Sequence, residues 1–263
     1  CVTLVGATPI FADIEEDYWC ICPDDVEAKI TDKTKAVIGV HLFGQPFSKR
    51  IREICDNHGL ALIEDAAQAH GAILDGKMAG AIGDVACFSF FPSKNMAVGG
   101  EGGMICTTRP ELADKLDRIV NHGRNQNLES IELGTNMRMS EVNAAIGRVQ
   151  LKHVDDWVKI RNQNAKKIAH STPVRENSVH GWHQLCIQTD NPNELIAKMD
   201  QSGIDARVHY PLILNKHAVY RNHPQHEIDL PRSENIAKKL VAIPVHPSLT
   251  EEEINRINSV LNP

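Results

Sequence analysis

Short apolar segments alternate with segments of helical periodicity along the first part of the chain. The runs "TPIFADI", "KAVIGVHLFG" and "LALIEDAAQ" are typical of strands, and the patterns "PDDVEAKI" and "FSKRIREICDNHG" lie between them and are typical of helices. In the second helical pattern Ile51, Ile54 and Cys55 share one face, and Gly59 supplies a C-terminal stop. Strands that alternate with helices indicate βαβ units, so we expect an α/β protein with a mainly parallel sheet.

The rest of the chain predicts two more strands, a long helix and a smaller α+β lobe. "GDVACFSFF" and "GGMICTT" are expected to be strands joined by a loop that contains Lys94, and "RPELADKLDRIVNHG" to be a helix. From Ser140 a helical stretch is long enough to connect two lobes. After Pro173 the pattern predicts a strand in "GWHQLCIQTD", a helix in "NPNELIAKMDQSG", a strand in "IDARVHYP" and a helix in "TEEEINRINSVLN". We therefore predict a large domain over residues 1–145, and a connecting helix with a smaller domain over residues 146–263.

Composition excludes several classes of function. The 263 residues have a formal net charge of -6 and no dense run of Lys and Arg, which disfavours nucleic-acid binding. No apolar stretch is long enough to cross a bilayer, and Cys1–Gly6 is too short for the apolar region of a signal peptide. The seven cysteines lie mostly in apolar strings, which favours reduced thiols and a cytoplasmic protein. The CxC pair Cys20 and Cys22 and the scattered histidines have no recognised metal-ligand spacing, so we predict no metal site.

Two polar residues follow the apolar strand in "LALIEDAAQ". Ligands of open α/β sheets bind outside the carboxyl ends of the strands, which makes Asp65 and Gln68 candidates for a binding site. A carboxylate at the end of a buried strand is costly unless it meets a cation or several hydrogen-bond donors. Asp65 is therefore expected either to pair with a protonated ring nitrogen of a ligand or to cap a helix that begins in "DAAQ".

A lysine lies between an apolar run and a cluster of glycines in "SFFPSKNMAVGGEGG", residues 89–103. Most loop lysines are solvated charges. At the mouth of a sheet, however, the amine of Lys94 is expected to be desolvated, to have a lowered pKa and to capture an aldehyde as a Schiff base. Ser89 and Ser93 supply hydroxyl groups for a phosphate, whereas "GGEGG" is also explained by a tight turn.

Seven sequence blocks occur together and in one order: "GATPIFADI", "GVHLFGQP", "LIEDAAQAHGA", "GDVACFSFFPSKNMAVGGEGGMI", "GTNMRMSEVNAAIG", "GIDARVHYP" and "LTEEEI". With these blocks, nearly the whole chain resembles the pyridoxal-phosphate-dependent nucleotide-sugar aminotransferases of the DegT/StrS family. The resemblance implies the aspartate-aminotransferase fold, fold type I of the pyridoxal-phosphate enzymes. In this fold a three-layer α/β large domain with a mainly parallel sheet is followed by a smaller α+β C-terminal domain.

The resemblance also implies roles for individual residues. Lys94 matches the lysine that forms a Schiff base with pyridoxal 5'-phosphate and then moves a proton during the reaction. Asp65 matches the acid that pairs with the pyridine nitrogen. Gln68 matches the residue packed against the cofactor ring, and Ser89 a phosphate ligand. Asn136 matches an asparagine that reaches the cofactor phosphate of the neighbouring subunit, which implies a homodimer with shared active sites.

Five further residues are candidates for substrate binding, each with a structural alternative. His41 and His70 flank the expected pocket, although a histidine at a strand end is more often a hydrogen-bonded structural residue. Arg138 is expected to meet a carboxylate or phosphate of a substrate, or to form a structural ion pair. His209 and Tyr210, in "ARVHYP", are expected to face the substrate or to pack the smaller lobe.

The lysine at position 94 separates the reactions known in the family. Relatives that dehydrate sugars have histidine there, so the resemblance implies transfer of an amino group from an amino acid, with glutamate expected, to a nucleotide-linked keto-sugar in amino-sugar and polysaccharide biosynthesis. A dehydratase or epimerase and a non-catalytic dimerising protein are the alternatives. The chain starts at Cys1 without the segment that precedes "GATPIF" in the family, and we expect its large domain to be N-terminally incomplete.

Overall fold

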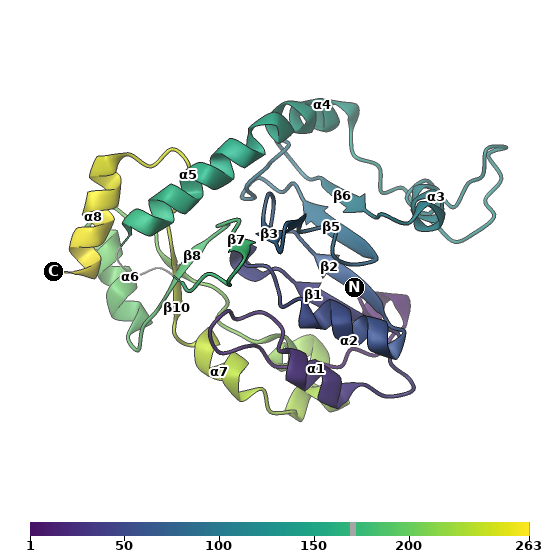
Figure 1. Ribbon diagram of the computed structural model, residues 1–263, viewed down its shortest axis with the longest axis horizontal. Helices are drawn as coiled ribbons and strands as arrows, with labels where there is room; N and C mark the ends of the chain where they lie inside the picture. Colours follow the sequence, from purple (N-terminus) through teal and green to yellow (C-terminus); the bar gives the residue numbers. More distant parts are fainter. Residues whose placement is uncertain (169–171, 263) are drawn as a thin grey trace.

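Four strands form the central sheet of the computed structural model, which describes residues 1–168 and 172–262 (Figure 1). They are β1 (Ala36–Val40), β2 (Ala61–Asp65), β5 (Val85–Ser89) and β6 (Gly103–Cys106), in the order β1-β2-β5-β6. The strands β1, β2 and β5 run parallel to one another, and β6 is antiparallel to β5. The predicted α/β fold is therefore confirmed, and the mainly parallel sheet ends in one antiparallel strand.

Two helices of this part follow the periodicity of the sequence. α1 (Pro23–Lys29) begins with proline at its first position, and α2 (Arg50–His58) buries Ile51, Ile54 and Cys55 against the sheet. Gly59 ends α2 in the left-handed conformation, with φ 62°, and its amide donates to carbonyl groups of the last turn. The predicted helix and its stop signal are both confirmed.

The strand predicted in "TPIFADI" is absent. In that segment, residues 8–14, Ile14 makes a single antiparallel bridge to Ile21, and no ladder forms. The reason lies in Asp13, which is 4% exposed. Its carboxylate accepts hydrogen bonds from the amides of Arg232 and Ser233 at 3.0 and 2.9 Å, at the start of α7 (Pro231–Ala237). These side-chain bonds replace a strand ladder and tie the segment to a distant helix.

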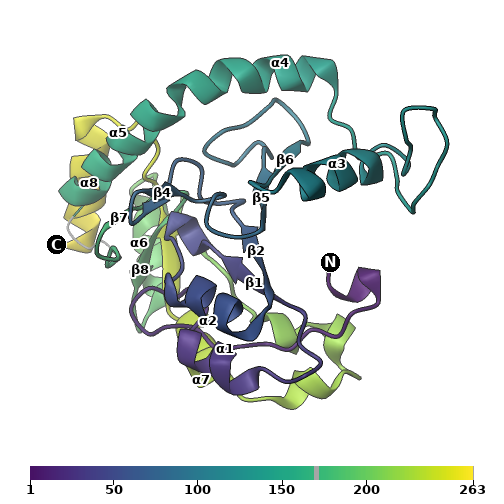
Figure 2. The ribbon, with the colours of Figure 1, turned by 45° about the vertical axis from the view of Figure 1, so that its right-hand side comes forward.

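The long helical stretch is two helices joined by a 3-10 turn. α3 (Pro110–Ile119) precedes it, and the stretch itself consists of α4 (Glu141–Gln150), the turn Leu151–His153 and α5 (Val154–Lys167). Ser140 caps α4 by accepting a hydrogen bond from the amide of Asn143 at 3.2 Å. Figure 2 shows α4 and α5 as one curved arm that extends from the sheet to the C-terminal helices. The predicted connection is present, with a break that periodicity did not reveal.

A second sheet organises the C-terminal part. The strands β8 (Leu185–Gln188) and β9 (Arg207–Val208) both pair antiparallel with β10 (Leu240–Ile243), which the sequence analysis did not identify. α6 (Pro192–Gln201) and α8 (Glu251–Leu261) pack against this sheet, and Thr250 and Glu253 form a capping box at the start of α8. The short strands β3 (Ile73–Leu74), β4 (Lys77–Met78) and β7 (Ser178–Val179) form a third sheet.

The two parts of the chain share a hydrophobic cluster. Trp19 and Phe43 from the first part pack with Cys186, Leu240 and Ala242 from the second. The division at residues 145 and 146 stays a prediction, and this cluster fixes the C-terminal part against the loop that follows β1. All seven cysteines are free thiols. Among the described residues, no helix is long and apolar enough to span a membrane.

Candidate active site

The carboxyl end of β2 carries Asp65 on the face opposite Glu64, because side chains alternate along a strand. Its Cα pairs with Val40 on one side and with Cys87 on the other, so Asp65 lies at the end of the parallel strands. The carboxylate accepts a hydrogen bond from the amide of Ala67 at 3.0 Å. The segment after Asp65 forms turns instead of a helix, so the helix-cap alternative does not apply. Apart from the bond to Ala67, no hydrogen bond or ion pair to this carboxylate is present in the described part of the chain.

Lys94 lies in the loop that follows the neighbouring strand β5. Its amide donates to the carbonyl of Phe91 at 2.9 Å, and the chain then returns so that the amide of Val98 bonds the carbonyl of Phe90 at 3.2 Å. Burial lowers the pKa of the Lys94 amine, and the charge of Asp65 opposes this shift. Because Asp65 ends β2 and Lys94 follows the neighbouring parallel strand β5, both residues lie at the same edge of the sheet. A lowered pKa increases the fraction of neutral amine, which is the nucleophilic form.

Gln68, Phe43 and Tyr210 form a connected group beside Asp65. The buried amide of Gln68 accepts a hydrogen bond from the amide of Phe43 at 2.5 Å and donates to the hydroxyl of Tyr210 at 2.9 Å. The rings of Phe43 and Tyr210 stack with centroids 6.3 Å apart. Burial raises the pKa of Tyr210, and the charge of Asp65 adds to this effect. The structure thus brings together Gln68 and Tyr210, which are 142 residues apart in sequence.

Three buried histidines belong to this region, and one of them, His183, was not predicted from the sequence. The pKa of His70 is lowered to about 4 and that of His183 to about 3, chiefly by burial, and the positive charge of Lys94 contributes to both shifts. The pKa of His209 is also lowered, chiefly by burial. The buried Nδ1 atoms of all three have no hydrogen-bond partner of good geometry among the described residues, although the His70 ring approaches the backbone of Ser89. No motif around His183 could have indicated its place beside Lys94.

His41 lies in a different environment, inside the core. Its side chain is 0% exposed, its ring stacks on Phe47, and its Nε2 lies 2.8 Å from a carboxylate oxygen of Glu64. The carboxylate of Glu64 also accepts hydrogen bonds from the amides of Gly80, Ile82 and Gly83, at 2.8, 2.8 and 2.6 Å. This arrangement favours the structural alternative for His41, because its ring is occupied by protein groups.

We expect Glu64→Gln to destabilise the fold. The pKa of Glu64 lies below its ordinary value, because hydrogen bonds from His41 and the amides of Gly83 and Gly80 outweigh the opposing effect of burial. Loss of this buried carboxylate is expected to lower the free energy of unfolding at pH 7 by about 3 kcal/mol. Chemical denaturation measures the change, and Glu53→Gln on the exposed side of α2 is the matched control.

The effect of Glu64→Gln depends on pH in a defined direction. The folded pKa of Glu64 is lowered, so its contribution is complete above the unfolded value of about 4.3 and is lost as the pH falls through the folded pKa. The stability difference between wild type and variant is therefore expected to shrink below about pH 4. A difference that stays constant from pH 7 to pH 3 would contradict the ionised state assigned to Glu64.

Three other residues predicted from the sequence, Ser89, Asn136 and Arg138, have fewer contacts with the residues around Lys94 and Asp65. The hydroxyl of Ser89, at the end of β5, accepts a hydrogen bond from the amide of Phe91 at 3.3 Å. Asn136 and Arg138 are exposed between α3 and α4, where the Nε of Arg138 donates to Asn136 at 3.1 Å. None of their hydrogen bonds among the described residues connects them to Lys94 or Asp65, and the ion pair considered for Arg138 does not form within the described part of the chain. Their expected roles stay predictions.

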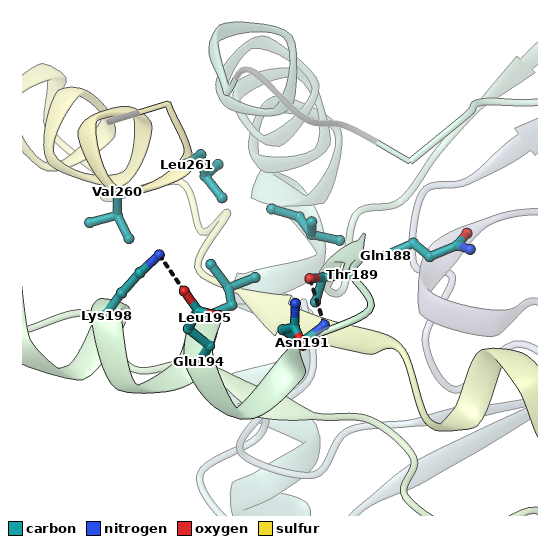
Figure 3. A pocket seen from close by; sticks show the side chains of 9 residues that line it. Gln188, Thr189, Asn191, Glu194, Leu195, Lys198, Val260 and Leu261 are labelled. Atoms are coloured by element: carbon teal, nitrogen blue, oxygen red, sulfur yellow. Dashed lines mark hydrogen bonds and ion pairs between the residues drawn. The ribbon is translucent and has the colours of Figure 1, made fainter.

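A separate pocket lies in the C-terminal part, between the end of β8, α6 and the end of α8 (Figure 3). Leu195, Val260 and Leu261 contribute apolar side chains, and the ion pair between Lys198 and Glu194 lies at its border. This pocket contains none of the residues predicted from the sequence.

The candidate active site therefore lies at the edge of the central sheet. It consists of Lys94, Asp65, Gln68, His70, His183, His209 and Tyr210.

Comparison with known proteins shows which family the chain belongs to. The model of the DegT/DnrJ/EryC1/StrS aminotransferase family matches residues 1–262. The chain belongs to this family. The family resemblance noted from the seven sequence blocks is thereby confirmed, and the match extends over both parts of the chain.

Individual members of the DegT family are similar over nearly the whole chain. The dTDP-3-amino-3,4,6-trideoxy-alpha-D-glucose transaminase of Streptomyces venezuelae is 36% identical, over 97% of this chain and 70% of that protein. The "Pleiotropic regulatory protein" of Geobacillus stearothermophilus is 39% identical, over 96% of this chain and 71% of that protein. The X-ray structure of S. venezuelae DesV in complex with ketimine intermediate has a TM-score of 0.94 at 35% identity, over 99% of this chain and 73% of that chain. The predicted aminotransferase fold is confirmed.

Proposed function

We propose that this DegT-family protein transfers an amino group from an amino acid, with glutamate expected, to a nucleotide-linked keto-sugar and uses pyridoxal 5'-phosphate. The observation that carries the proposal is the position of Lys94 and Asp65. A partly buried amine in the loop after β5 and a carboxylate at the end of the neighbouring parallel strand β2 lie at the same edge of the sheet, and the charge of Asp65 raises the pKa of Lys94 against the larger lowering by burial. The relatives include a dTDP-sugar transaminase, which supports a nucleotide-linked sugar as the acceptor.

The residues at this site fit the proposed cofactor. The amine of Lys94 is partly desolvated and suits an aldehyde, and the carboxylate of Asp65 retains acceptor capacity for a protonated ring nitrogen. Buried ring nitrogens of His70 and His183 lack partners among the described residues, as expected of a site that holds a polar ligand. When bound, pyridoxal phosphate supplies an electron-withdrawing ring that stabilises negative charge at a substrate carbon. The cofactor would be held by Lys94, Asp65, Gln68 and Ser89.

The side chains of the chain itself have distinct tasks in this proposal. Lys94 accepts and returns a proton at the substrate carbon, which its lowered pKa favours near neutral pH. The carboxylate of Asp65 would pair with the protonated ring nitrogen of the cofactor. Gln68 is held by Phe43 and Tyr210, so it presents a fixed amide beside Asp65. The buried, neutral imidazoles of His70 and His183 exclude water without adding charge.

The proposal includes a homodimer in which the partner supplies Asn136. Asn136 is exposed, and none of its hydrogen bonds among the described residues connects it to Lys94. Large apolar side chains lie nearby on the surface, with Met137 63% exposed, Val142 71% and Val149 59%. Exposed apolar side chains of this size are typical of a subunit interface. The cytoplasmic location predicted from the cysteine pattern also belongs to this proposal.

Covalent capture tests the proposal. Protein incubated with pyridoxal phosphate is expected to develop a visible absorption band, and borohydride is expected to fix one cofactor on Lys94, which peptide mass spectrometry locates. Glutamate added before borohydride is expected to prevent this labelling, because the cofactor then carries the amino group. Lack of labelling in the wild type would overturn the proposal.

A regulatory role without catalysis is the second candidate, since one relative with 39% identity carries the name "Pleiotropic regulatory protein". A purely regulatory protein is expected to show no glutamate-dependent change in the absorption band. A dehydratase or epimerase is less consistent with lysine at position 94. A screen of nucleotide keto-sugars with the loaded protein distinguishes these outcomes, because only an aminotransferase converts glutamate to 2-oxoglutarate in a sugar-dependent reaction.

A further inference from the structure

Gln68 carries a buried carboxamide three residues after Asp65. The residue is 7% exposed and lies in the turns that follow β2. A carboxamide has an acceptor oxygen and two N–H donors, and a buried one needs partners for both ends. The sources of these partners decide how firmly the group is oriented.

The oxygen of this carboxamide is fixed by the turn that follows β1. The amide of Phe43 donates to Oε1 at 2.5 Å, and a backbone amide is a donor only, so the oxygen and not the nitrogen faces Phe43. The carbonyl of Phe43 in turn accepts from the amide of His183 at 2.9 Å. The carbonyl of the next residue, Gly44, accepts from the amide of Gly181 at 2.8 Å. The donor to the carboxamide oxygen is therefore held on a fixed turn.

The nitrogen of the carboxamide is fixed from the C-terminal part of the chain. Its Nε2 donates to the hydroxyl of Tyr210 at 2.9 Å, and no other hydrogen bond to this nitrogen is present among the described residues. The ring of Tyr210 lies nearly parallel to that of Phe43, with 10° between the planes and 6.3 Å between the centroids. Phe43 thus holds the carboxamide oxygen through its amide and supports the tyrosine ring through its side chain.

The hydrogen bond to Tyr210 decides the plane of the carboxamide. With the bond to Phe43 alone, the group can turn about the axis of that bond, whereas a second bond at the nitrogen leaves one orientation. Without the hydroxyl, a buried N–H would also lose its partner, which costs more than the bond itself contributes. A tyrosine that follows β9 therefore controls a side chain 142 residues earlier in the sequence.

We propose that Tyr210 is a positioning residue that acts through Gln68 and holds its carboxamide in one orientation beside Asp65. This role differs from the two expected from the sequence, which were contact with substrate and packing of the smaller lobe. The effect on pyridoxal phosphate rests on the proposed function, whereas the orientation of Gln68 does not. Side chains at a binding site need such support from neighbouring groups to keep a productive geometry.

Nuclear magnetic resonance of the cofactor-free protein tests the orientation directly. The side-chain NH₂ signals of Gln68 in ¹⁵N-labelled protein are assigned by their absence in Gln68→Leu. These protons are expected to exchange slowly with water in the wild type. Tyr210→Phe removes the hydroxyl and keeps the ring on Phe43, and it is expected to accelerate the exchange about 10-fold, as for the loss of a buried hydrogen bond. Exchange that stays as slow in folded Tyr210→Phe as in the wild type overturns the proposal.

A double-mutant cycle tests whether Tyr210 acts through Gln68. The dissociation constant of pyridoxal phosphate is measured from its visible absorption. Tyr210→Phe is expected to raise this constant about 10-fold in the wild-type background and to leave it unchanged in the Gln68→Leu background, where no carboxamide remains to be oriented. A tyrosine that contacts the sugar instead raises KM for the sugar in both backgrounds and leaves the cofactor constant unchanged. That result overturns the proposal, as do additive effects of the two substitutions.

Tyr220→Phe is the matched control. The hydroxyl of Tyr220 lies 3.4 Å from that of Thr3 and its ring packs edge-on against Phe11, away from the candidate site. This variant is expected to change neither the exchange of the Gln68 amide nor the affinity for pyridoxal phosphate. Circular dichroism and thermal melting establish that each variant is folded.

The same experiments separate this proposal from the proposed function. If borohydride fixes no cofactor on Lys94 but the exchange of the Gln68 amide depends on Tyr210, the aminotransferase proposal fails and the positioning by Tyr210 stands. If labelling succeeds and the effects of the Tyr210 and Gln68 substitutions add, the function stands and the positioning fails.

Discussion

Replacement of Lys94 by arginine is expected to abolish covalent capture of pyridoxal phosphate and to lower the aminotransferase rate by about 10²- to 10⁴-fold, the contribution of a positioned proton-transfer group. Arginine keeps the positive charge near Asp65, but its guanidinium does not deprotonate in proteins. The variant therefore tests the nucleophilic amine and the proton transfer without removing the cation. Burial lowers the pKa of the native amine, and this is the property that arginine cannot reproduce.

The measurement combines borohydride labelling with a coupled assay for 2-oxoglutarate. Lys77→Arg is the matched control, because Lys77 is an exposed lysine in the short strand β4 and has no role in the candidate site. The control is expected to be labelled and to react like the wild type. If Lys94→Arg retained borohydride-stable cofactor at a defined residue, another lysine would be the attachment point and the assignment of Lys94 would be wrong.

Local signals in the sequence predicted much of the large-domain fold. The face formed by Ile51, Ile54 and Cys55 and the stop at Gly59 are properties of adjacent residues, and α2 has both. The strand predicted around Asp13 does not form. The hydrogen-bond partners of Asp13, Arg232 and Ser233, are more than 200 residues away in sequence. Single-sequence periodicity contains no information about such a partner.

Some residues of the candidate site could likewise be predicted from the local sequence, and others could not. Asp65, Gln68 and Lys94 were found because they follow apolar strands, a local signal that strand ends provide. His183 carries no such signal. It enters the site because the carbonyl of Phe43 accepts a hydrogen bond from its amide at 2.9 Å. Residues supplied by a second segment become visible only when tertiary contacts are known.

Replacement of Asp65 by asparagine is expected to lower the aminotransferase rate by about 10²- to 10³-fold, as for the loss of one preorganised electrostatic group at a reacting centre. Asparagine can still accept the hydrogen bond from the amide of Ala67, so the turn after β2 should persist. A neutral amide cannot keep a ring nitrogen protonated, and the electron-withdrawing capacity of the cofactor would fall. Labelling of Lys94 by borohydride is expected to remain, which distinguishes this variant from Lys94→Arg.

Asp65→Asn also has an expected effect on pH dependence. The charge of Asp65 raises the pKa of Lys94 against the larger lowering by burial, so its removal lowers that pKa further. At a given pH the variant then has more neutral amine, and the pH profile of cofactor attachment should move to lower pH. The rate of attachment, measured from pH 6 to pH 10, tests this shift, with Asp75→Asn as the control because Asp75 pairs with the exposed Lys49. An unshifted profile together with undiminished activity would show that Asp65 and Lys94 do not act on one ligand, and the proposed function would lose the interaction that carries it.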